Sequence, residues 1–200
     1  MSLREKKKIE TKNNIFEVAG RLFKEKGFES TSIDEITEEA GIGKGTFFNY
    51  FPTKEALLVY FGEQRDEIIY SLIGNELATV CSTRDKIKKV LAFLAENYEK
   101  DKELTKLLVF EYIKYIRFTD LKSDEDKKRR YRLIKIISDL LEEGVREGDV
   151  RSTIDVKKTT EILTAIYLFS LMAWLKPESD YSFAMDISEK IDMVFKGIGS

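Results

Sequence analysis

The sequence predicts an all-α protein of about nine helices. Lys, Glu, Leu and Ile dominate the composition, which favours long helices. Only 2 prolines and 11 glycines are spread over 200 residues, which leaves few turn residues for an all-β chain. Apolar residues also recur at helical spacing along the chain. With 42% hydrophobic and 35% charged residues, the composition is that of a globular protein with a buried core.

Composition and polarity also exclude several classes of protein. A lone cysteine, Cys81, leaves no partner for an internal disulfide and suggests a reducing compartment. The polar stretch 1–10 does not resemble a signal peptide. The longest uncharged apolar run, Ile162–Leu175, is shorter than the roughly 20 residues that span a bilayer. We therefore expect a cytoplasmic protein without a membrane partner.

The first helix is expected from about Thr11 to Lys26, because apolar residues recur there at helical spacing and Gly27 can end the helix. Residues 1–12 contain the basic side chains Arg4, Lys6, Lys7, Lys8 and Lys12 and the acidic side chains Glu5 and Glu10. Such a basic arm either adds sequence-independent contacts to phosphates or is a solvated, partly disordered terminus. The sequence leaves both interpretations open.

Two short helices separated by a glycine turn follow. Ser32 and Glu35 have the spacing of a capping box, which begins a helix that ends at Gly41. The second short helix is expected from Lys44 to about residue 51, where Pro52 stops it. This outline is a helix-turn-helix, in which the N-terminal residues of the second helix contact the edges of DNA bases.

The run Gly41-Ile42-Gly43-Lys44-Gly45-Thr46 is not a phosphate loop. A P-loop has a glycine five residues before its Gly-Lys pair, where this chain has Glu38. It also has Ser or Thr directly after the lysine, where this chain has Gly45. No strand is expected before the run, and we therefore reject a nucleotide-binding site.

Six further helices are expected after Pro52. Their approximate ranges are 54–80, 84–100, 102–117, 124–147, 155–176 and 181–196. The residues expected to face inward in the first of them are Leu57, Leu58, Phe61, Ile68, Ile69, Leu72, Ile73 and Leu77. In 124–147 the expected inward residues are Ile134, Ile137, Leu141 and Val145.

Several spaced features of the N-terminal quarter coincide with a known pattern. They are Gly27-Phe28, Thr31, Ile36, Ala40-Gly41-Ile42, Lys44-Gly45-Thr46, Tyr50-Phe51 and Lys54-Glu55-Ala56-Leu57-Leu58. In these features the chain resembles the DNA-binding signature of the TetR family of transcriptional regulators.

The resemblance implies a helix-turn-helix DNA-binding domain with a basic arm over residues 1–53. It implies a helical regulatory and dimerisation domain over residues 54–200. The expected function is that of a homodimeric repressor on a palindromic operator in double-stranded DNA, released by a small-molecule effector.

The expected DNA-contacting residues lie in and beside the two short helices. They are Ser30, Thr31, Ser32, Lys44, Gly45, Thr46, Asn49, Tyr50 and Lys54. Lys44 and Thr46 are expected to contact bases or backbone, and the resemblance assigns phosphate contacts to Tyr50 and Lys54. The chain departs from the family pattern twice. Gly43 replaces a capping serine, and Phe48 replaces a tyrosine whose hydroxyl contacts phosphate.

The two C-terminal helices are expected to form a dimer interface. A helix that is apolar all round, as in Ile162–Leu175, must be buried all round, by its own chain and by a partner. The expected interface residues are Ile162, Ile166, Phe169, Ala173, Phe183, Ile187, Ile191 and Phe195. The alternative is a monomer with both helices inside its own core.

Candidates for an effector pocket come from the aromatic residues of the body. They are Phe93, Phe110, Glu111, Tyr115, Tyr167 and Trp174. The alternative is that these aromatics only fill the core. A buried Glu111 would need a cationic or hydrogen-bonding ligand, or an internal Lys or Arg.

An enzyme is not expected, because the chain has no histidine, one cysteine and no evident metal-ligand cluster. No cofactor or metal is predicted. The remaining alternative is a helical dimeric interaction protein without sequence-specific DNA binding.

Overall fold

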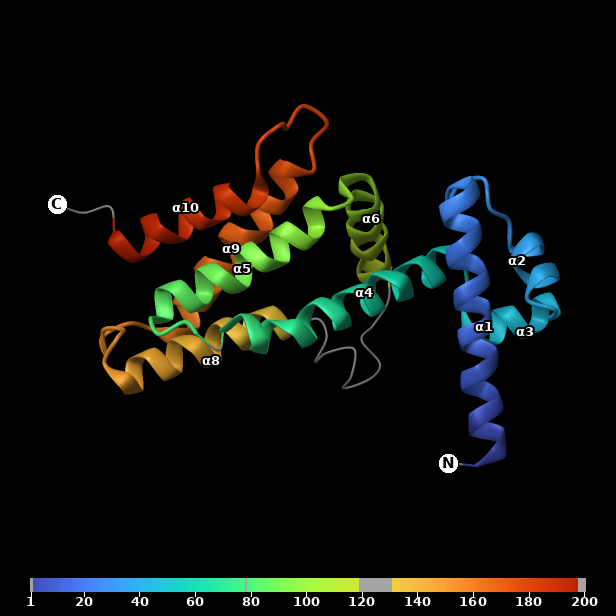
Figure 1. The fold of residues 1–200 in the computed structure, drawn as a ribbon, viewed down its shortest axis with the longest axis horizontal. Coiled ribbons are helices and arrows are strands. Elements are labelled where there is room, and N and C mark those ends of the chain that lie inside the picture. The colour runs from blue at the N-terminus through green and yellow to red at the C-terminus, as the bar shows by residue number, and fades with distance from the viewer. Residues whose placement is uncertain (1, 78, 119–130, 198–200) are drawn as a thin grey trace. The chain divides into compact units, whose positions relative to one another are not determined.

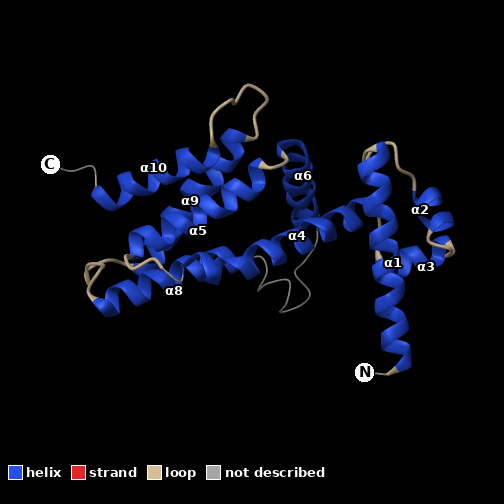
Figure 2. Cartoon of the chain, in the orientation of Figure 1, coloured by secondary structure: helices blue, strands red, loops and turns tan. Residues whose placement is uncertain are grey.

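The computed structural model describes residues 2–77, 79–118 and 131–197, with side chains left out at 115–118. In these ranges the chain forms nine α-helices and no strand (Figures 1 and 2). The helices are α1 (Leu3–Lys26), α2 (Ile33–Glu39), α3 (Lys44–Tyr50), α4 (Lys54–Leu77), α5 (Thr83–Glu99), α6 (Lys102–Phe118), α8 (Arg132–Glu147), α9 (Val156–Trp174) and α10 (Phe183–Lys196). The predicted all-α class is confirmed.

The helices belong to two compact units. The first contains residues 1–64 and 108–118, and the second contains 65–107 together with the described part of 119–200. The long helices α4 and α6 therefore each contribute to both units. The domain boundary after residue 53 stays a prediction. The first half of α4, up to residue 64, packs in the same unit as α1, α2 and α3.

The core of the first unit is apolar and aromatic. It is formed by Ile15, Ala19, Leu22, Ile36, Phe47, Phe51 and Leu57. Phe16 of α1 stacks on Phe61 of α4 with ring centroids 4.0 Å apart. Gly20 permits this approach, because a Cβ at that position would lie 3.0 Å from the Phe61 ring. The first half of α4 is thus held against α1.

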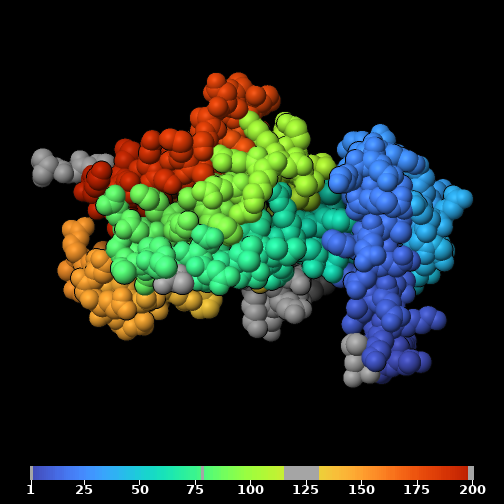
Figure 3. All heavy atoms as spheres, in the orientation of Figure 1, coloured from blue at the N-terminus to red at the C-terminus, as the bar shows by residue number. Residues whose placement is uncertain are grey.

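The core of the second unit surrounds α5. It includes Ile87, Leu91, Leu94, Ile137, Leu141, Leu163, Phe183, Ile187 and Ile191. Helix α10 packs along α5, and their atoms adjoin in the space-filling view (Figure 3). Tyr167 and Trp174 of α9 pack on the ring of Phe183, at 5.4 and 5.6 Å between centroids. None of the described helices has the length and apolar character that crossing a membrane requires.

Three expectations about the helices are corrected. Helix α1 begins at Leu3 rather than near Thr11, because Ser2 and Glu5 form a capping box and the basic arm is helical. In α4, Ile68 and Leu72 are exposed while Ile69 and Ile73 are buried, since neighbouring residues differ by about 100° around a helix. Ile134 of α8 is likewise exposed. The predicted stretch 124–130 lies outside the described residues.

Candidate nucleic-acid interface

The turn between α2 and α3 is fixed by backbone bonds and by α1. Gly41 takes a φ of +65°, a left-handed conformation that favours glycine. The Ile42 N–H donates to the Thr37 carbonyl at 3.0 Å. Asn14 of α1 donates from Nδ2 to the Ala40 carbonyl at 2.8 Å, which ties the turn to the longer helix. The orientation of α3 against α2 is therefore determined within the unit.

The start of α2 has the predicted capping box. The Glu35 N–H donates to Ser32 Oγ at 3.2 Å, and the Ser32 N–H donates to Glu35 Oε2 at 2.9 Å. Lys26 adds an ion pair with Glu35 Oε1 at 2.8 Å. The Lys26 bond and the two donors of Ser32 lower the pKa of Glu35 to about 2. The carboxylate is thus held ionised at the N-terminal end of α2.

Helix α3 begins without a side-chain cap, since Gly43 supplies none. Phe47 is fully buried beneath the helix, and Thr46 and Tyr50 are half-buried. Lys44, Gly45, Phe48 and Asn49 are exposed. The exposed arc of this short helix is therefore a mixture of polar groups, backbone and one aromatic ring.

Two predicted contacts are engaged elsewhere in the protein. Thr31 is 1% exposed, and its hydroxyl donates to the Gly27 carbonyl at 2.8 Å, so the expectation that it contacts phosphate is wrong. Lys54 Nζ donates to the carbonyls of Phe28 and Thr31 at 2.8 and 2.9 Å. It also lies 4.3 Å from the centroid of the Phe28 ring. Lys54 therefore links the start of α4 to the loop before α2, a structural role that the sequence did not indicate.

The other predicted DNA contacts remain accessible. Ser30 and Ser32 are exposed, although the Ser32 hydroxyl takes part in the capping box. Lys44 Nζ forms an ion pair with Asp34 Oδ1 at 2.6 Å, and both side chains are exposed. A hollow of about 320 Å³ lies next to Lys54 and is lined by Ser32, Phe48, Thr53 and Glu55 among others. Asp34 and Phe48 were not among the predicted DNA contacts. Their exposure beside Lys44 makes them additional candidates for contact with DNA.

The six effector-pocket candidates do not fall in one unit. Phe110 and Glu111 belong to the first unit, whereas Phe93, Tyr167 and Trp174 belong to the second. Phe110 is exposed, and Phe93 is half-buried. Glu111 is 9% exposed and is paired with Lys114 one helical turn away, which is the internal partner that its burial requires. The side chain of Tyr115 lies outside the described residues.

Two buried hydroxyls in the second unit have no hydrogen-bond partner among the described residues. They belong to Thr164 and Tyr167, which are three residues apart on α9. Burial raises the pKa of Tyr167 well above its usual value, with further contributions from Tyr70 and Asp66. Asp66 accepts a hydrogen bond from the Tyr98 hydroxyl at 3.1 Å. Trp174, in contrast, stacks on Phe183 and fills the core.

The predicted dimer residues divide into two groups. Ile162 and Phe169 are 54% and 73% exposed, and Ile166, Ala173 and Phe195 are half-buried. Phe183, Ile187 and Ile191 are fully buried within their own unit. We expected these three at a dimer interface, and that expectation is wrong, because side chains enclosed by α5 and α9 cannot contact a partner.

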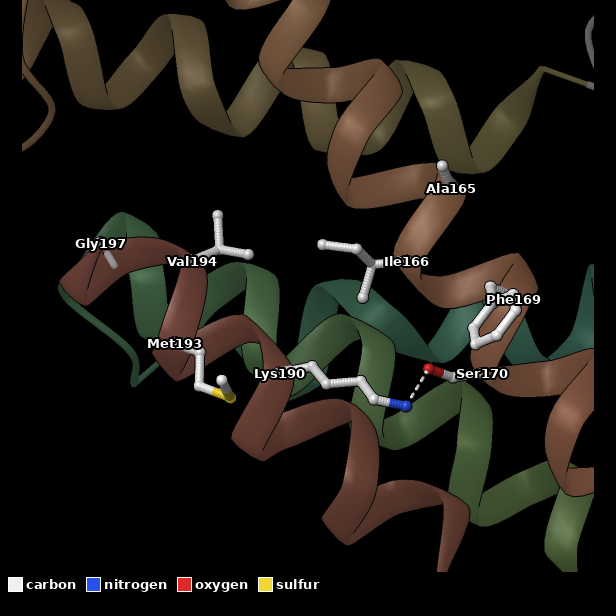
Figure 4. A pocket seen from close by; sticks show the side chains of 8 residues that line it. All are labelled: Ala165, Ile166, Phe169, Ser170, Lys190, Met193, Val194 and Gly197. Carbon is white, nitrogen blue, oxygen red and sulfur yellow. Dashed lines mark hydrogen bonds between the residues drawn. The ribbon is translucent and has the colours of Figure 1, made fainter. Parts of the chain in front are cut away.

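A groove of about 560 Å³ runs between α9 and α10 (Figure 4). Its walls are mostly apolar and include Ile166, Phe169, Met193 and Val194. Lys190 crosses it and donates from Nζ to Ser170 Oγ at 2.8 Å and to Asp186 Oδ2 at 2.6 Å. The amine is therefore neutralised within the chain, and the rest of the groove is an apolar surface.

These features define a helix-turn-helix protein with a second, larger helical unit. Residues 15–61 match the family model described as bacterial regulatory proteins, tetR family. The matched segment runs from the middle of α1 into α4, so the likeness to that family rests on the helix-turn-helix unit.

Relatives and solved structures extend the likeness beyond this segment. The uncharacterized HTH-type transcriptional regulator YuxN of Bacillus subtilis is 38% identical over 101 residues, 50% of this chain and 33% of that protein. The chain thus spans about a third of YuxN. The HTH-type transcriptional repressor KstR2 of Rhodococcus jostii is 24% identical over 199 residues, 94% of this chain and 91% of KstR2.

Among solved structures, the TetR-family repressor FadR of Thermus thermophilus, in complex with lauroyl-CoA, superposes with a TM-score of 0.73. It is 22% identical, and the match covers 94% of this chain and 95% of that chain. FadR from Bacillus subtilis, in complex with stearoyl-CoA, gives a TM-score of 0.66 at 18% identity, covering 93% and 98%. At these identities the likeness establishes the fold.

Proposed function

We propose that this protein is a DNA-binding transcriptional regulator, a homodimeric repressor that a small-molecule effector releases from a palindromic operator. The exposed face of α3 is the observation that carries the proposal. This face exposes Lys44, Gly45 and Asn49, which do not pack in the core. The helix itself is held in place by the turn at Gly41 and by the hydrogen bond from Asn14. Helices presented in this way insert into the major groove of DNA.

Contacts to phosphate supply most of the affinity in such complexes. The first turns of α1 carry Arg4, Lys7 and Lys8, all exposed, in the same unit as α3. Ser32 and Thr53 line the hollow beside Lys54 and offer hydroxyls. We expect the affinity for DNA to fall steeply with salt, because each neutralised phosphate releases counterions.

The test is binding of the full chain to fluorescent duplex DNA from the region upstream of its own gene. A sedimentation measurement establishes the oligomeric state in parallel. Thr46→Ala should change the preference among operator variants, whereas Lys54→Ala should weaken binding to all sequences alike. A dimer that binds no duplex at low salt would contradict this proposal and favour the helical interaction protein without sequence-specific DNA binding.

Dimerisation through α9 is proposed from the exposed apolar residues Ile162 and Phe169 and from the groove beside them. No charged residue lies between 162 and 175, so burying this face against a partner removes no charge from water. A two-fold axis would bring the same face of two copies together.

An effector site in the second unit is proposed from the hydroxyls of Thr164 and Tyr167. Burying a hydroxyl without a hydrogen-bond partner costs free energy. A bound molecule that supplies the missing hydrogen bond stabilises the protein conformation to which it binds. The FadR structures hold lauroyl-CoA and stearoyl-CoA, so acyl-CoA thioesters are the first compounds to test. Release of the bound DNA by an acyl-CoA, with loss of that response in Tyr167→Phe, would support the site.

A further inference from the structure

Phe48 lies at the centre of the exposed face of α3. With about 3.6 residues per turn, Lys44, Gly45, Phe48 and Asn49 fall within one arc of the helix, and all four are exposed. The opposite arc carries the buried Phe47, and Thr46 is half-buried at its edge. The structure therefore places Phe48, rather than Thr46, in the middle of the surface that a DNA groove would meet.

The fold does not use this ring for its own core. Phe47 and Phe51 already fill the space beneath α3. Phe48 touches Phe47 edge to face, with centroids 5.6 Å apart, and remains 48% exposed. A phenyl ring left half in water gives up much of the free energy that its burial would supply. Packing within the unit therefore does not account for a phenylalanine here.

Gly45, one turn before Phe48, gives a second and independent indication. A Cβ at Gly45 would meet no atom within 4 Å. Its φ is also outside the positive range, in which only Gly27, Gly41, Gly148 and Gly197 are found among the described residues. Glycine inside a helix lowers stability, so neither space nor backbone geometry of the free protein explains it. The missing side chain at Gly45 does permit a molecule to approach the backbone of α3 closely beside the Phe48 ring.

The chemistry of the ring selects what it contacts. In the major groove the C5 methyl of thymine is the apolar group on the base edges, and phenylalanine contacts it favourably. Lys44 and Asn49 flank the ring with donors suited to guanine and adenine edges. We infer that Phe48 is a specificity-determining residue that selects a thymine in each operator half-site through its methyl group. The inference rests on the proposed function, since it requires that α3 enters the major groove.

Uracil tests this inference, because it lacks only the C5 methyl and keeps the hydrogen bonds of thymine. An operator is first selected from random duplex DNA with the full-length chain, and each thymine is then replaced singly by deoxyuridine. At one position per half-site we expect about a fourfold loss of affinity, the size of one lost methyl contact. Phe48→Ala should bind thymine and uracil operators equally well, while Phe48→Tyr keeps the ring and the discrimination.

Ile113→Ala is the matched control, since this residue of α6 is 42% exposed in the same unit but lies outside the helix-turn-helix. It should discriminate against uracil as the wild type does, and circular dichroism should show unchanged folding of both alanine variants. A selected operator in which every uracil is tolerated, or discrimination that persists in Phe48→Ala, would overturn the inference alone. Failure to select any operator would overturn the proposed function, and the inference with it.

Discussion

The α2–α3 pair of the first unit and the α9–α10 pair of the second both expose apolar side chains, but the residues around those side chains differ. On α3 the Phe48 ring stands among Lys44, Gly45 and Asn49. On α9 the exposed residues Ile162, Leu168, Phe169 and Met172 follow one another along an uncharged stretch. A ring among polar groups suits a hydrated, polar partner, whereas a continuous apolar face suits contact with protein.

The two pairs also differ in the polar bonds that supplement their apolar packing. Helices α2 and α3 have seven residues each and bury Ile36 and Phe47 in the core. Polar links such as the Ser32–Glu35 capping box and the bonds from Lys54 add to that packing. Helices α9 and α10 are longer and are held by side chains packed around Phe183. The comparison teaches that exposure alone does not define an interface, because the chemistry of the surrounding residues decides which kind of partner fits.

Phe169→Glu should produce the largest effect. A charge placed on the apolar face of α9 would be buried in the proposed dimer, and a two-fold interface contains it twice. We expect the dissociation constant of the dimer to rise by at least about thirtyfold, as for a central interface residue. Sedimentation velocity over a concentration series measures this.

Met185→Glu is the control for that change, since Met185 is 67% exposed on α10 but does not line the groove. Its dimer should remain intact. Equal sedimentation of Phe169→Glu and wild type would remove α9 from the proposed interface and weaken the contrast with α3.

Gly45→Ala should separate binding from stability. The added methyl group meets open space in the free protein, so stability should be unchanged or rise by up to about 1 kcal/mol through helix propensity. Affinity for operator DNA should fall by about tenfold, because the methyl group holds the DNA away from the backbone. Thermal unfolding and DNA titration of the same preparation test both expectations. Unchanged affinity would mean that α3 does not approach DNA closely.

Lys54→Ala should lower stability as well as DNA affinity. The variant leaves the Thr31 carbonyl without the Lys54 donor and the Phe28 carbonyl with only the Thr31 N–H, at a cost of about 1–2 kcal/mol for partly buried groups. Denaturant titration measures the loss, and Lys24→Ala, an exposed lysine of α1, serves as the control. A variant as stable as the wild type would show that the polar links do not hold the first unit as argued above.

Glu35→Gln should have the smallest effect, and that effect should depend on pH. The pKa of Glu35 is lowered from 4.5 to about 2 by Lys26 and Ser32, so the ionised carboxylate stabilises the folded form above pH 4.5. This contribution is lost as the pH falls from 4.5 through 2. The thermal midpoints of variant and wild type should therefore differ at neutral pH and converge near pH 2. A difference independent of pH would exclude the charge as its cause.

Local patterns in the sequence were sufficient for much of the candidate site. The Ser32–Glu35 box, the turn at Gly41 and the ends of α3 involve residues within a few positions of one another, and the structure has them as predicted. The same kind of signal is present at Ser2 and Glu5, where α1 begins, although the predicted helix begins only near Thr11.

By itself, then, the sequence determined the all-helical class, the helix-turn-helix and the apolar character of the last two helices. Tertiary structure decided which faces are covered. Phe183, Ile187 and Ile191 repeat every four residues, a pattern shared by a dimer stripe and an internal core, and only packing on α5 and α9 shows that they are core. Lys54 donates to carbonyls 26 and 23 residues away, and Asp34 pairs with Lys44 across the turn. Such contacts join segments whose proximity depends on the fold, and helical periodicity carries no information about them.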